Sequence, residues 1–63
     1  MLDPTTLQPG QRVRAVVTGC VEPVACEVTA EKDHGWAVLR VTEEGWPASL
    51  LLRCEDYIPL EIL

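Results

Sequence analysis

The fold class of this 63-residue chain is decided by the stretch HGWAVLRVTEEGWPASLLLR, from His34 to Arg53. In its first half, Ala37, Leu39 and Val41 share one side, and the turn sequence EEGWP separates this half from a second apolar run. Alternation with a period of two is typical of strands that bury one face, whereas a helix has a 3.6-residue period. The stretch therefore predicts two antiparallel strands joined by a turn.

The same alternation of apolar and polar residues continues in the rest of the chain, between the turn sequences LQPGQ, GCVEP, EKDHG and DYIP. No segment keeps a helical apolar period for three turns, so helix is restricted to a short turn near Tyr57. A flat sheet of this size would leave an apolar face and two edges open to water, so we expect five short strands to curl into a closed barrel. The expected inward-facing residues are Val13, Ala15, Val17, Val24, Cys26, Val28, Ala30, Ala37, Leu39, Val41, Leu50, Leu52 and Cys54. A last short strand is expected from Ile58, Leu60 and Ile62.

The chain resembles the small SH3-like barrels in its opening LQPGQRVRA, its succession of hairpins and its close CEDYIPLEIL. In those barrels a glycine precedes the first strand, and a single turn of 3₁₀ helix precedes the last. The resemblance implies an all-β fold, one five-stranded antiparallel SH3-like barrel that occupies residues 1–63 as a single domain. An OB-like barrel is the alternative, but it usually has a helix between its third and fourth strands, for which EEGWPAS is too short.

Charge and cysteine content restrict the environment and the partners. The net charge is −5, and residues 31–63 hold seven of the ten acidic side chains. This charge repels nucleic acid and favours a basic protein as the partner. Three cysteines are an odd number, which favours a reducing cytoplasm over disulfide pairing in a secreted domain. Neither a signal peptide nor an apolar run that could span a membrane is present, so we expect no membrane association.

Several apolar residues fall on the outward side of the alternation, where polar residues are expected. They predict a protein-binding patch rimmed by Arg12, Arg14, Arg40 and Glu27, although barrel closure, a bulge at Gly19 or the chain termini could cover them instead. In a tight hairpin Trp36 would lie nearly opposite Arg53, close enough for a cation–π contact. The predicted contact residues are Val16, Trp36, Val38, Arg40, Trp46, Leu51 and Arg53.

The residues that could carry chemistry do not form a recognised motif. A metal interpretation of Cys20, Cys26, His34 and Cys54 fails on spacing, because C-x₅-C is not the C-x₂-C pattern of zinc knuckles. Cys26 and Cys54 also fall on the core side, and Cys20 beside a glycine is the thiol expected to be exposed. Asp33 and His34 have no predicted nucleophile nearby. We therefore predict no metal, no cofactor and no enzymatic activity.

The sequence thus favours a non-enzymatic protein-binding module, a small accessory subunit or regulator. Its expected partner is another protein of basic character, or a second copy of the chain. The alternative is a small nucleic-acid-binding barrel that uses Arg12, Arg14, Arg40, Arg53 and Trp36 on RNA or single-stranded DNA. The single lysine and the negative charge make nucleic acid the weaker alternative.

Overall fold

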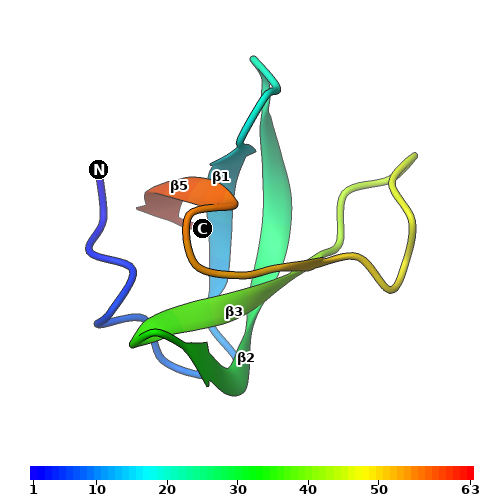
Figure 1. Cartoon of the computed structure of the whole chain (residues 1–63). Helices are drawn as coiled ribbons and strands as arrows, with labels where there is room; N and C mark the ends of the chain where they lie inside the picture. The colour runs from blue at the N-terminus through cyan, green and yellow to red at the C-terminus, as the bar shows by residue number, and fades with distance from the viewer.

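The computed structural model describes residues 1–63 as a single curled sheet without helices (Figure 1). Its five strands pair only in antiparallel fashion, in the order β4-β3-β2-β1-β5. The prediction of an all-β fold with five antiparallel strands is therefore confirmed. The strands are β1 (Arg12–Val17), β2 (Pro23–Asp33), β3 (Trp36–Val41), β4 (Leu51–Leu52) and β5 (Tyr57–Ile62).

The β2–β3 hairpin closes through a two-residue turn. Asp33 pairs with Trp36, and the residues between them, His34 and Gly35, have φ angles of 49° and 82°. Positive φ at both central positions defines the type I′ turn, whose twist matches that of the flanking strands. Glycine adopts this conformation without strain, whereas His34 adopts it at some cost. The turn therefore fixes the register of the hairpin.

The prediction that Val38 is exposed is wrong, and a bulge in β2 lies opposite this residue. Val28 pairs with Leu39 and Lys32 pairs with Ala37, so residues 29–31 of β2 stand opposite the single residue Val38. Such a bulge interrupts the alternation of faces and bends the strand. Val38, predicted to face outward, is completely buried, and Ala30, predicted to face inward, is exposed. The thirteen buried residues otherwise come mainly from the predicted inward positions of β1 to β4.

The last strand forms where it was predicted, but the apolar residues that predicted it lie on its exposed face. Tyr57 and Pro59 are buried, whereas Ile58, Leu60 and Ile62 are exposed. The Tyr57 hydroxyl donates a hydrogen bond of 2.5 Å to the carbonyl of Ala37. Because its polar group is hydrogen-bonded, the large Tyr57 ring can occupy the buried side of the strand. Because successive side chains of a strand alternate, Ile58 must then point outward.

The predicted closure of the barrel is not observed. Strands β4 and β5 are the two edges of the sheet and are not hydrogen-bonded to each other. The N-terminal segment instead lies beside both β5 and β3, since the Leu2 N–H donates to the Pro59 carbonyl and the Ala37 N–H donates to the Pro4 carbonyl, each at 2.9 Å (Figure 1). Together with the Tyr57 hydroxyl, these bonds connect the two ends of the curled sheet.

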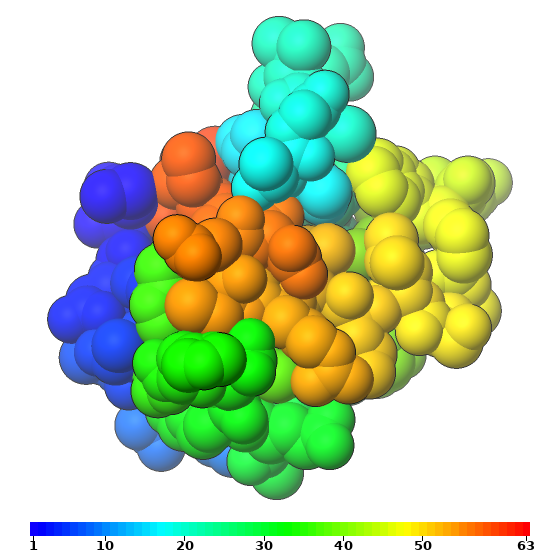
Figure 2. Space-filling model, in the orientation of Figure 1, coloured from blue at the N-terminus to red at the C-terminus, as the bar shows by residue number.

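The fourth strand is shorter than predicted. Only Leu51 and Leu52 pair with β3, although the apolar run ASLLLRCED suggested a longer strand. Residues 42–50 form a loop that projects from the body of the molecule, as does the turn between β1 and β2 (Figures 1 and 2). The Glu43 carboxylate anchors the base of the loop by accepting the Ala25 N–H at 2.8 Å.

Candidate functional site

The two tryptophans are both half-buried and pack against the core rather than forming an exposed patch. The ring of Trp36 meets that of Tyr57 edge-on, with centroids 5.4 Å apart and an interplanar angle of 76°. The predicted cation–π contact of Trp36 with Arg53 is not observed: β4 ends at Leu52, and the Trp36 ring contacts Tyr57 instead. Arg53 itself is exposed.

Two of the four arginines are matched with glutamates. Arg40 on β3 forms an ion pair with Glu27 on β2, and Arg14 on β1 lies 3.3 Å from Glu61 on β5. Their side chains remain partly open to water, so each pair contributes little to stability. Each pair does neutralise an arginine that a phosphate contact would use. The outer face is therefore a surface of alternating charge.

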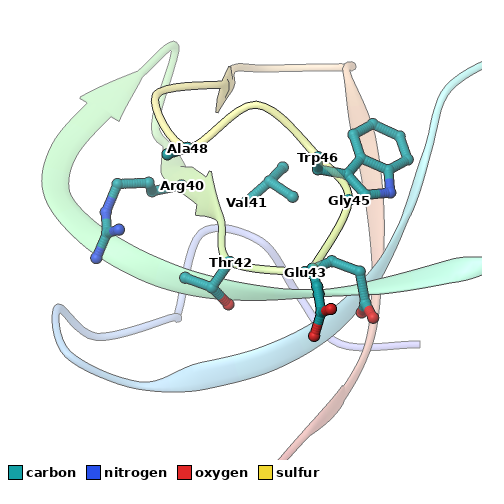
Figure 3. A pocket seen from close by; sticks show the side chains of 8 residues that line it. Arg40, Val41, Thr42, Glu43, Gly45, Trp46 and Ala48 are labelled. Atoms are coloured by element: carbon teal, nitrogen blue, oxygen red, sulfur yellow. The ribbon is translucent and has the colours of Figure 1, made fainter.

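A shallow depression of about 280 Å³ lies between the end of β3 and the projecting loop (Figure 3). It brings together Arg40 and Trp46 from the predicted contact residues, and Leu51 lies beside Arg40 in the neighbouring strand. It does not include Val16 or Trp36. Pockets that enclose small-molecule ligands usually start at about 300 Å³. The lining residues are Arg40, Val41, Thr42, Glu43, Glu44, Gly45, Trp46 and Ala48.

An apolar surface that sequence reasoning missed lies along β5. Four of the six exposed large apolar side chains belong to residues 58–63, with exposed fractions of 38% to 51%. Val16, a predicted contact residue, pairs with Ile58 and is half-buried. Tyr57 was the signal in the sequence that could have identified this surface: Tyr57 and Ile58 are adjacent, so they lie on opposite faces of the strand, and burying Tyr57 exposes Ile58. We define the β5 surface as Val16, Ile58, Leu60, Ile62 and Leu63.

The chain also brings together three potential metal ligands from two separate turns. Donor atoms of Asp33, His34 and Cys54 all lie within 4.8 Å of one another. His34 Nδ1 lies 3.2 Å from Asp33 Oδ1, and the Cys54 N–H donates to Asp33 Oδ2 at 3.1 Å. Of the four residues considered as metal ligands from the sequence, only His34 and Cys54 belong to this cluster. Cys20 is exposed and Cys26 is buried, and neither is among the clustered residues.

This cluster is not an activated nucleophile. Desolvation, followed by the carboxylates of Glu55, Asp33 and Asp56, raises the pKa of the Cys54 thiol above its usual range. A catalytic cysteine needs the reverse, a positive environment that favours the thiolate. Burial likewise raises the pKa of Cys26 to about 11, with a smaller contribution from Glu43. Neither thiol is therefore prepared for nucleophilic chemistry at neutral pH.

Comparisons with protein-family models, with curated proteins and with solved structures found no match to this chain. Nothing helical in the structure has the length and apolar character that crossing a membrane demands. Two features therefore remain from which a function can be inferred: the β5 surface and the cluster of Asp33, His34 and Cys54.

Proposed function

We propose that the chain is a non-enzymatic protein-binding module with an SH3-like barrel arrangement, acting as a small accessory subunit or regulator. Two local features support the SH3-like arrangement. Gly10, with a φ of 90°, precedes β1, and a hydrogen-bonded turn from Arg53 to Asp56 precedes β5. The bonds of Leu2, Ala37 and Tyr57 described above connect the two ends of the curled sheet, which is consistent with this arrangement.

The observation that carries the proposal is the concentration of exposed apolar side chains on an edge strand. Proteins usually protect such edges with charges, prolines or covering segments. Here β5 contains Pro59, but beyond its pairing with β1 its backbone receives a single further bond, from Leu2. Side chains 38% to 51% exposed, on an edge strand to which the N-terminal segment adds one bond, offer both an apolar contact and some backbone pairing to an extended segment.

Charge identifies the kind of partner. The chain carries a net charge of −5, and Glu55 and Asp56 immediately precede β5. A second copy would bring the same negative charge to the interface and be repelled at low salt. A protein segment that is extended, alternately apolar and flanked by lysine or arginine complements both features. We therefore infer a basic protein as the partner.

Cytoplasmic localisation belongs to the same proposal. All three cysteines are free, and Cys20 is exposed. An exposed free thiol persists more readily in a reducing compartment than in an oxidising one. The thiols thus support a module that works in the cytoplasm.

Selection from a displayed library of linear random peptides tests the proposal. We expect enrichment of segments that combine apolar and basic residues, and perturbation of the amide resonances of β5 when a selected peptide is added. Ile58 and Ile62 are each about half exposed, so burying the exposed half against a peptide is worth about 1 kcal/mol, and replacing either by serine should lower peptide affinity by about fivefold. The matched control is Val21→Ser, because Val21 is 91% exposed in the β1–β2 turn and lies outside the β5 surface.

Three outcomes contradict the proposal. If the serine variants and Val21→Ser bind equally well, then the β5 surface is not the contact. If sedimentation at low salt shows a dimer that Ile58→Ser disrupts, then the occupant is a second copy. If labelled RNA or single-stranded DNA binds at low salt while no peptide is enriched, the nucleic-acid alternative replaces the proposal.

A further inference from the structure

Asp33, His34 and Cys54 form a cluster at one end of the molecule that the proposed protein-binding function does not use. Asp33 ends β2, His34 occupies the type I′ turn, and Cys54 lies in the turn between β4 and β5. Their donor atoms lie within 4.8 Å of one another although Cys54 is some twenty positions away in sequence. The fold, and not local sequence, therefore creates the cluster.

The donor set is one that zinc prefers. A thiolate sulfur, an imidazole nitrogen and a carboxylate oxygen are the three ligand types found in zinc sites, whereas calcium and magnesium take oxygen alone. Donors around a tetrahedral zinc ion lie about 3.5 Å apart, given bond lengths of about 2.0–2.3 Å. The 3.2 Å separation of His34 Nδ1 and Asp33 Oδ1 already fits this value. Closing the remaining distances requires a shift of about 1 Å in side-chain position.

One hydrogen bond and one turn hold the backbone of the donors near this arrangement. The Cys54 N–H donates to Asp33 Oδ2, which ties the β4–β5 turn to the end of β2. The type I′ turn fixes the backbone of His34, while its side chain, 83% exposed, is free to rotate towards a ligand. Binding therefore orders few groups, which reduces its entropic cost.

The charge of the cluster suits a divalent cation. On binding, the Cys54 thiol would release its proton to solvent, and the resulting thiolate and the Asp33 carboxylate together would balance the two positive charges of zinc. Glu55 and Asp56 follow Cys54 directly and add negative charge on the same turn. An ion there offsets the repulsion among these groups.

We propose that Asp33, His34 and Cys54 bind one zinc ion, with solvent as the fourth ligand, and that the ion links the β2–β3 turn to the turn between β4 and β5. The three protein ligands leave a coordination position open. The ligands lie at the turns and are not part of the β5 surface, so zinc binding can be measured without the proposed protein partner.

Titration of the chelator-treated protein with zinc by calorimetry, and with cobalt by absorption spectroscopy, tests this proposal. We expect one zinc per chain, a thiolate-to-cobalt charge-transfer band with tetrahedral d–d bands, and a rise in Tm with added zinc. His34→Asn and Cys54→Ser should each weaken zinc binding by about tenfold or more. Asparagine suits the first central position of a type I′ turn, so His34→Asn retains the fold. The control Cys20→Ser should leave binding unchanged.

Any of three results overturns the proposal. The first is the absence of heat and of a charge-transfer band at millimolar metal. The second is full binding by the folded variants His34→Asn and Cys54→Ser. The third is loss of binding in Cys20→Ser, which would assign the metal to the exposed thiol. Failure here leaves the peptide-binding experiments unaffected, because they monitor β5.

Discussion

Removing a single hydroxyl group, in Tyr57→Phe, tests how the two ends of the curled sheet are connected. The Tyr57 side chain is 1% exposed, and its hydroxyl donates to the carbonyl of Ala37, a residue with no exposed surface. The N–H of Ala37 bonds to Pro4, outside the β2–β3 ladder, so its carbonyl depends on the Tyr57 hydroxyl. Phenylalanine keeps the ring and its edge-on contact with Trp36 but leaves a buried carbonyl without a donor.

The expected loss is about 1–2 kcal/mol of unfolding free energy, from one net hydrogen bond and the desolvation of the unsatisfied carbonyl. For a domain of this size the loss corresponds to a fall in Tm of roughly 5–15 °C. Urea and thermal unfolding, followed by tryptophan fluorescence and far-UV circular dichroism, measure both quantities. Thr18→Val is the control, because it removes a hydroxyl whose bond to the Glu55 carbonyl is exposed. A loss below about 0.5 kcal/mol, or one equal to that of Thr18→Val, refutes the reasoning.

Three further predictions concern stability. Burial raises the pKa of Cys26 from 9.0 to about 11 and that of Tyr57 from 10.0 to about 12, which favours the protonated forms in the folded state. The contribution of these two groups to stability should therefore be complete below about pH 9 and be lost between about pH 9 and 12, which urea unfolding across this range checks. Gly35→Ala should cost about 1 kcal/mol in the same assay, because alanine is strained at a φ of 82°. A double-mutant cycle on Arg40→Ala and Glu27→Ala should give a coupling of about 1 kcal/mol or less that decreases with salt; a larger, salt-independent value contradicts a solvent-screened pair.

Local sequence predicted most of the strands correctly. β1 coincides with the run RVRAVV, and β3 begins at Trp36 as expected. Alternation and turn residues depend on neighbours in the chain, so they can be interpreted without knowing the fold. Of the proposed contact residues, however, Val38 is buried, and only Arg40 and Trp46 line a common depression.

The errors share a physical cause. β3 and β5 carry apolar residues on both parities, so alternation could not decide which face is inward. In β5 the inward face is the one that carries Tyr57, whose buried hydroxyl has a hydrogen-bond partner. Ile58, the next residue, therefore faces outward. At Val38 two extra residues of β2 interrupt the pairing, and Val38 is buried together with both of its neighbours although it lies outside the core cluster. Bulges depend on pairing between strands and leave little trace in one strand alone.

The sequence by itself determined that this is a small, acidic, all-β protein of five strands, because side-chain alternation, turn glycines and charge are local properties. Only the tertiary structure decided which apolar residues remain exposed along β5 and which donors meet at Asp33, His34 and Cys54. Both depend on the register between segments far apart in the chain. That register is set by the packing of the whole core, which no short stretch of sequence contains.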